Sequence, residues 1–267
     1  SQGYQHVINQ IALLVDQMEK SLGYRPDTIG IGTPGTMDPN TGLFKNSNSE
    51  SLNYKPLRKD LEELLRMKVI TANDANCFAL AETRLGIVKE RFPESEVVFG
   101  VIMGTGAGGG IVVRNNVISG KQGIAGEWGH NFLDESGGPC YCGKSGCVEN
   151  IIAGPALEKY YKEQSGTSRN LKEIVALANA NADPVAVQTL DRLHKMFGKA
   201  LSVVINILDP DVIVIGGGVG NISSLYDKGI EQLKEYVFND RLDTPVVRPS
   251  LGDSAGVFGA AFLTENL

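Results

Sequence analysis

Three of the four cysteines of this chain lie within eight residues, and a histidine stands ten positions before the first of them. These are Cys140, Cys142 and Cys147, preceded by His130. Three thiolates and an imidazole so close in sequence are typical of a tetrahedral Zn²⁺ site. The alternative is two disulfides or unrelated free thiols, but three clustered cysteines cannot all pair with one another, and Cys77 belongs to a different segment. Four protein ligands leave no position for a reacting water, so the pattern predicts a structural zinc.

The composition is that of an ordinary water-soluble globular protein. The chain has 267 residues, 42% hydrophobic and 21% charged, which is enough for one large or two modest domains. The net charge of −6 argues against a nucleic-acid-binding surface, because neutralising phosphates requires an excess of Lys and Arg. No apolar run approaches the ~20 residues of a membrane span, and no signal-peptide pattern opens the chain. Cysteines in a metal pattern fit a reducing compartment, so we expect a cytoplasmic protein.

Hydrophobic periodicity predicts helices that alternate with strands along the chain. We expect a long helix beginning at Pro184 with Asp183 as its N-cap, and a helix from Pro56 that turns Leu57, Leu61, Leu64 and Leu65 inward. The other expected helices cover residues 4–22, 74–86, 155–163, 170–179, 222–238 and the C-terminal end; the expected strands cover residues 27–31, 68–72, 97–103, 111–113, 117–119, 211–215 and 246–248. This order predicts an α/β fold with a largely parallel sheet and antiparallel hairpins.

Two glycine-rich turns are candidate phosphate sites. Gly104, Gly106 and Gly109 formally satisfy G-x-G-x-x-G after a strand, but the segment that follows reads as a strand, which excludes a dinucleotide site of the usual kind. The turn can still present backbone N–H groups, and Thr105 a hydroxyl, to phosphate; the alternative is a bend that merely needs glycine. Residues 216–218 stand between a strand and a helix, where a nucleotide or simple packing of the turn against the sheet would explain the glycines equally well.

Asn73 and Asp74 end a predicted strand and open a helix. Ligands of open α/β sheets bind at the carboxyl ends of strands, so a carboxylate here is a candidate catalytic group. The alternative is an ordinary helix N-cap. Residues 32–35 form a similar turn after an earlier strand.

Taken together, these segments resemble the ROK family of sugar kinases and repressors over nearly the whole chain. The most specific part joins residues 127–130 (EWGH) to residues 140–149 (CYCGKSGCVE), which look like the family signature ExGH…CxCGxxGCxE. Residues 73–76 (NDAN) look like its catalytic segment. Within the family the chain looks closest to bacterial fructokinase and mannokinase members, and next to N-acetylglucosamine kinases.

The resemblance implies an actin-like (ASKHA, ribonuclease H-like) two-lobed fold, with residues 1–100 plus 252–267 in one lobe and residues 101–251 in the other. It implies a homodimer that uses ATP and Mg²⁺ to phosphorylate a hexose (fructose, mannose or glucose) at its 6-hydroxyl. An N-acetylhexosamine kinase, a sugar-sensing repressor whose DNA-binding part is absent here, and a zinc-stabilised sugar-binding protein without catalysis are the alternatives. A basic helix-turn-helix upstream would identify a repressor.

The resemblance also implies roles for individual residues. Asp74 would be the general base. The residues implied in sugar binding are Asn48, Asn73, Glu127, His130 and Glu149, and His130 would place one ring nitrogen on zinc and the other toward the sugar. The turn formed by Gly104, Thr105 and Gly106 would hold phosphate, and Gly216, Gly217 and Gly218 would border the adenosine.

One departure from the family pattern lies at the start of the chain. Kinases of the family begin with a strand and a DxGGTK-type phosphate loop whose aspartate helps to position Mg²⁺, and nothing before Gly23 resembles it. We therefore expect that the first β-hairpin region is missing from this chain, and that residues 1–267 alone have negligible kinase activity.

Overall fold

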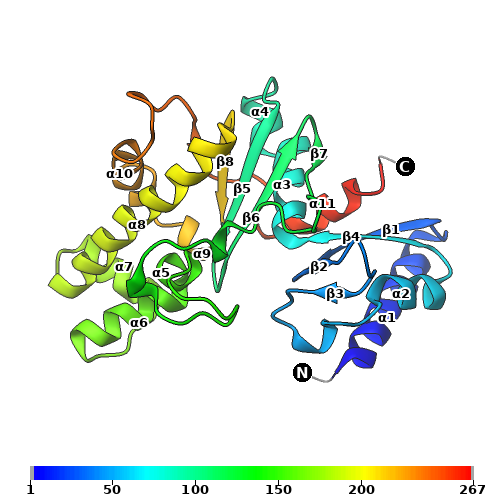
Figure 1. The fold of residues 1–267 in the computed structure, drawn as a ribbon. Helices are drawn as coiled ribbons and strands as arrows, with labels where there is room; N and C mark the ends of the chain where they lie inside the picture. Colours follow the sequence, from blue (N-terminus) through cyan, green and yellow to red (C-terminus); the bar gives the residue numbers. More distant parts are fainter. Residues whose placement is uncertain (1–2, 266–267) are drawn as a thin grey trace.

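The computed structural model describes residues 3–265, which form two lobes built around separate sheets (Figure 1). The larger sheet has the strand order β7-β6-β5-β8-β9. Its central strand β5 (Val97–Met103) pairs antiparallel with β6 (Ala107–Val113) and parallel with β8 (Val212–Gly216). The short strands β7 (Asn116–Val117) and β9 (Val246–Val247) complete it.

The smaller sheet joins β1 (Thr28–Thr33) to β4 (Lys68–Asn73) in parallel. An antiparallel hairpin of β2 (Thr36–Met37) and β3 (Phe44–Lys45) follows β1, and a 3₁₀ turn spans Glu50–Leu52. Helices α1 (Tyr4–Leu22) and α2 (Leu57–Leu65) pack on this lobe, because Val15, Leu61 and Val69 belong to one buried apolar cluster. Gly23, directly after the expected helix of residues 4–22, ends α1 in the left-handed conformation that glycine adopts readily.

Long helix α8 (Pro184–Leu208) covers the larger sheet, where Phe197 and Leu201 share a buried cluster with Phe99 of β5. Asp183 accepts hydrogen bonds from the N–H groups of Val185 and Ala186, which confirms the predicted N-cap. The remaining helices of this lobe are α5 (Glu149–Ile152), α6 (Gly154–Ser165), α7 (Leu171–Asn179), α9 (Gly217–Gly220) and α10 (Lys228–Lys234).

Helices α3 (Asp74–Arg84) and α11 (Ala255–Phe262) lie between the two sheets (Figure 1). They touch through backbone: a Cβ on Gly259 would stand 1.7 Å from the carbonyl oxygen of Cys77. On the other side of α11, a Cβ on Gly30 of β1 would stand 1.8 Å from the carbonyl oxygen of Ala260. Glycine at these two positions lets α3, α11 and β1 stack without a side chain between them.

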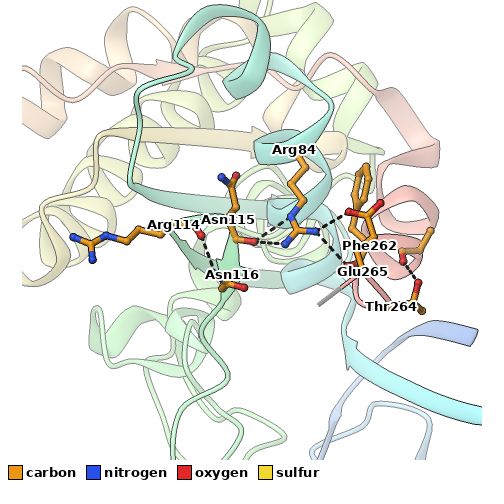
Figure 2. A network of polar contacts seen from close by, with 8 residues as sticks. Arg84, Arg114, Asn115, Asn116, Phe262, Thr264 and Glu265 are labelled. Carbon is orange, nitrogen blue, oxygen red and sulfur yellow. Dashed lines mark hydrogen bonds and ion pairs between the residues drawn. The ribbon is translucent and has the colours of Figure 1, made fainter. Parts of the chain in front are cut away.

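Arg84, the last residue of α3, joins this helix to the turn between β6 and β7 and to the end of α11 (Figure 2). Its guanidinium donates to the carbonyl oxygen of Asn115, in the turn between β6 and β7, at 2.6 and 3.1 Å. It also donates to the carbonyl oxygen of Phe262, the last residue of α11, at 3.4 Å, and to the carboxylate of Glu265, just after α11, at 3.1 Å. The short helix α4 (Ile87–Arg91) follows.

Two predictions about helices are wrong. Leu64 is 50% exposed, because the buried stripe of α2 runs through Leu57, Leu61 and Leu65. Residues 222–238 form two short pieces, the 3₁₀ turn Ser223–Leu225 and α10, because the Asp227 carboxylate accepts the Lys228 N–H and starts a new helix there. The division at residue 100 stays a proposal, and it falls inside β5. None of the helices in residues 3–265 combines the length and the hydrophobicity that crossing a membrane requires.

Candidate functional site

The parallel pairing of β1 and β4 brings Thr33 beside Asn73 at the carboxyl edge of the smaller sheet. The Asn73 side chain accepts the Ala75 N–H at 2.9 Å and caps α3, so Asp74 becomes the first residue of the helix. The Asp74 carboxylate accepts the same N–H at 2.8 Å. The N-cap interpretation therefore applies to Asn73, which leaves most of the Asp74 carboxylate free for another task.

Asp74 is exposed, but the protein around it withdraws the carboxylate from bulk water. This loss of hydration raises the pKa of Asp74 above its usual value, and the N–H groups of Ala75 and of Asp74 itself oppose the shift. A carboxylate with a raised pKa at a helix N-terminus is a better proton acceptor than an ordinary aspartate.

Glu127 lies within electrostatic reach of Asp74, Glu149 and His130. Burial raises the pKa of Glu127, the negative charges of Asp74 and Glu149 raise it further, and nearby His130 lowers it. The segment that carries Glu127 and His130 is held on β6 by the Trp128 indole, which donates to the carbonyl oxygen of Gly108 at 2.9 Å. The structure thus brings Asp74, His130 and Glu149, which come from three segments, around the Glu127 carboxylate.

Glu149 also connects this group to the turn between β5 and β6. Its Oε2 accepts the Ala107 N–H at 2.9 Å, and a Cβ on Gly106 would stand 2.5 Å from the same oxygen. A side chain at position 106 would therefore displace the Glu149 carboxylate from its hydrogen bond to Ala107. Gly104 is fixed by backbone hydrogen bonds, donating to Gly106 at 2.9 Å and accepting from Gly154 at 2.8 Å, and Thr105 is exposed at the tip.

Residues 216–218 lie next to that turn. Gly217 has a φ of 84°, and a Cβ there would stand 2.3 Å from the carbonyl oxygen of Met103, so this position requires glycine for packing and for conformation. A Cβ on Gly104 would be 4.0 Å from the nitrogen of Gly218, which places the two glycine turns side by side. Gly217 and Gly218 are exposed, while Gly216 is buried against the ring of Phe78.

The four predicted metal ligands converge. One ligand atom from each of His130, Cys140, Cys142 and Cys147 lies within 4.8 Å of the others. The His130 Nδ1 to Cys140 Sγ distance is 3.7 Å, and the Cys142 Sγ to Cys147 Sγ distance is 3.6 Å. A zinc tetrahedron with Zn–S bonds of about 2.3 Å has edges of about 3.8 Å, so the donor set fits the ion. Within residues 3–265 all four cysteines are free thiols.

Tyr141 is a neighbour of this cluster that the sequence did not single out. Its hydroxyl lies 3.0 Å from Nε2 of His130, the ring nitrogen that faces away from the cysteines. A sugar hydroxyl would have to displace or share this contact to reach His130. Tyr141 is 69% exposed and therefore has room to move. The one feature of the sequence that could have pointed to Tyr141 is its position between the predicted ligands Cys140 and Cys142.

Asn48, the remaining predicted sugar ligand, stays a prediction. It is exposed in the loop after β3, and no hydrogen bond in residues 3–265 joins it to Asp74 or Glu127. The loop itself is braced, because the Asn53 carboxamide accepts the Ser47 N–H and donates to the Ser47 carbonyl oxygen, both at 2.9 Å.

Comparison with known proteins gives a consistent answer. The ROK family matches residues 1–266. The chain is 33% identical to N-acetyl-D-glucosamine kinase of Aliivibrio salmonicida (strain LFI1238) over 273 residues, which covers 98% of this chain and 88% of the relative. The ROK hexokinase of Thermus thermophilus superposes with a TM-score of 0.86 at 32% identity, covering 98% of this chain and 86% of that one.

A ROK family glucokinase from Streptomyces griseus, solved with glucose and AMPPNP, gives a TM-score of 0.81 at 27% identity, with 100% of this chain and 90% of that one covered. The likeness to these structures confirms the predicted actin-like α/β fold. The match of the family to residues 1–266, and the 33% identity over 98% of this chain and 88% of the relative, support one conclusion: this chain belongs to the ROK family.

Proposed function

We propose that this protein transfers the γ-phosphoryl group of ATP to the 6-hydroxyl of a sugar, with Asp74 as general base. The observation that carries the proposal is the exposed Asp74 carboxylate with its raised pKa, near the Glu127 carboxylate, which in turn lies near Glu149. N-acetylglucosamine is our first choice of sugar, because the Aliivibrio salmonicida relative with that activity in its name aligns with 98% of the chain. Glucose is the second choice, since the Streptomyces griseus structure holds it. Fructose and mannose rest only on the resemblance seen in the sequence.

Each group around Asp74 has a task in this reaction. Asn73, Glu127, His130 and Glu149 would bind sugar hydroxyls, because carboxylates accept and amides both donate and accept hydrogen bonds. Asn48 would join them from the facing loop. Gly104, Thr105 and Gly106 would bind phosphate through backbone N–H groups and a hydroxyl, and the adjacent Gly216, Gly217 and Gly218 would border the adenosine.

The chemical step needs little covalent help from the protein. Asp74 accepts the proton of the sugar 6-hydroxyl while the oxygen of that hydroxyl bonds to the γ-phosphorus of ATP. The bond from that phosphorus to the β-phosphate oxygen breaks, and ADP leaves. Mg²⁺ bound with the nucleotide would neutralise phosphate charge. Positioning by the sugar ligands and the glycine turns then supplies most of the rate enhancement.

We also propose that zinc fills the cluster of His130, Cys140, Cys142 and Cys147 as a structural ion. All four ligands come from the protein, so no position is open for a reacting water. The ion would join the segment that ends at His130 to the segment that leads into Glu149. It would therefore fix one wall of the sugar site.

A panel of sugars tests the substrate assignment. With ATP and Mg²⁺, the full-length protein is expected to give its highest kcat/KM for N-acetylglucosamine, about tenfold or more above glucose, N-acetylmannosamine, mannose and fructose. A site that hydrogen-bonds one extra substituent discriminates strongly against sugars that lack it. A coupled assay of ADP release measures all five sugars under one condition.

The outcomes separate the proposals. Preference for glucose, mannose or fructose would overturn the choice of N-acetylglucosamine but keep the kinase. Tight binding of a sugar without any ADP release would overturn the kinase and favour a sugar-sensing or purely sugar-binding protein.

A further inference from the structure

A carboxylate is fully buried at the far end of the helix that begins with Asp74. Glu82, in the last turn of α3, has 0% of its surface exposed. Its Oε2 accepts the N–H of Ile87 at 3.0 Å and of Ser250 at 3.1 Å, and its Oε1 accepts the N–H of Leu251 at 3.0 Å. Among residues 3–265, none of the ion pairs includes Glu82. Backbone donors alone therefore satisfy this buried acid.

The three donors come from two segments far apart in sequence. Ile87 begins α4, directly after α3, whereas residues 250–251 lie on the connection from β9 to α11. Gly86 completes the arrangement: a Cβ there would stand 2.2 Å from Oε2 of Glu82, so a side chain at position 86 would push the carboxylate out of place. Gly86 has a negative φ of −95°, so its role is to leave room rather than to adopt a left-handed conformation.

We propose that Glu82 is a positioning residue for Asp74. Its carboxylate fixes the end of α3 to the start of α4 and to the connection that leads into α11. Asp74 and Glu82 are eight residues apart on one helix, about 12 Å at 1.5 Å per residue, so a tilt at one end moves the other. This inference rests on the proposed function, in which Asp74 is the general base.

The packing of α3 explains why such a fixed point matters. The helix contacts β5 and β6 on one side and α11 on the other, and its contact with α11 is backbone to backbone at Gly259. Residues 250–251 set where α11 begins, so the Glu82 hydrogen bonds set the position of α11 relative to α3. A displacement on the order of 1 Å at a catalytic group can cost about 100-fold in rate.

Glu82→Gln in the full-length protein tests this role. Glutamine keeps the size of the side chain but replaces one acceptor oxygen by an NH₂ group, which then faces a backbone N–H. We expect kcat to fall about 10- to 100-fold, with the KM values for sugar and ATP within about threefold of wild type. Hydrogen exchange should rise at Leu251 and also at Ala75, whose N–H reports on the start of α3.

Two further variants sharpen the test. Gly86→Ala retains the charge but displaces the carboxylate, so it should reproduce the fall in kcat. In a Glu82→Ala background its effect on Tm should shrink, because the clashing carboxylate is gone. Glu90→Gln is the matched control: Glu90 is exposed and touches the same segment only through the Ser250 hydroxyl at 3.4 Å, so its kinetics should equal those of wild type.

The outcomes are decisive in both directions. If Glu82→Gln lowers Tm but leaves both kcat and the exchange of Ala75 at wild-type values, Glu82 is only structural and the proposal is wrong. If the wild-type protein phosphorylates no sugar, the proposed function fails. The exchange of Ala75 in Glu82→Gln still decides whether Glu82 controls the start of α3.

Discussion

Replacing Asp74 by asparagine is expected to lower kcat by about 10²- to 10⁴-fold, the usual contribution of a general base. Asparagine cannot accept the proton of the sugar 6-hydroxyl. It can still hydrogen-bond that hydroxyl, so the KM for sugar should stay within about threefold of wild type. Steady-state kinetics with the preferred sugar and saturating ATP measure both quantities. Full activity of the variant would show that Asp74 is not the base.

The substitution should leave the fold intact. Asn73, not Asp74, caps α3, so its hydrogen bond to the Ala75 N–H is kept in the variant. The raised pKa of Asp74 means that the folded protein binds this proton more readily than the unfolded chain. The contribution of Asp74 to stability is therefore present below the unfolded pKa and is lost as pH rises through the folded pKa. At neutral pH Asp74→Asn should thus be at least as stable as wild type. Asp240→Asn, an exposed carboxylate in the loop after α10, is the control.

The same pKa shift predicts a pH profile. Only the deprotonated form of Asp74 accepts a proton, so kcat/KM should fall as pH decreases through its folded pKa. That acid limb should lie above the ordinary value of about 3.9, because loss of hydration raises the pKa. The residual activity of Asp74→Asn should lack the limb. A limb that persists unchanged in the variant would belong to another group, and Glu127, whose pKa is also raised, would be the next candidate.

Local signals in the sequence were enough to predict most helices and strands. Gly23 and Asp183 mark the ends of α1 and α8 because a helix cap depends on residues within one turn. The prediction of one helix over residues 222–238 and the prediction that Leu64 points inward were wrong, because both properties depend on packing partners elsewhere in the chain. The metal cluster was predictable since its cysteines are close in sequence and a tetrahedral ion demands their convergence.

The parts of the site that escaped prediction depend on distant pairings. Glu82 meets its partners across 168 and 169 residues, and a glutamate inside a helical pattern reads as a solvated position. Gly106 reads as a phosphate-binding glycine, but the structure gives it a second reason, close packing on the Glu149 carboxylate. Such contacts appear only when α3 is placed against the connection from β9 to α11, and α5 against the turn between β5 and β6.

Replacing Cys140 by serine is expected to remove zinc and to weaken sugar binding together. A serine hydroxyl is a far poorer zinc ligand than a thiolate, so metal content should fall from about one ion per chain to near zero. The Kd for sugar should rise about tenfold or more, since losing one well-placed hydrogen bond from a charged group costs about 1.5 kcal/mol or more. Metal analysis and calorimetric titration with the preferred sugar measure the two effects, and Tm should fall with them.

The reason lies in what the cluster connects. His130 is a proposed zinc ligand and also ends the short segment that begins with Glu127, while Cys147 stands two residues before Glu149. Without an ion, four donors within 4.8 Å have only weak contacts to hold them, and the two carboxylates lose their common anchor. Lys144→Arg is the matched control, because Lys144 is exposed in the same loop, holds Cys140 through its backbone carbonyl, and keeps its positive charge near Cys142 in this variant. A Cys140→Ser protein that has lost zinc but binds sugar as tightly as Lys144→Arg would separate the metal from the sugar site and leave the metal a purely structural role.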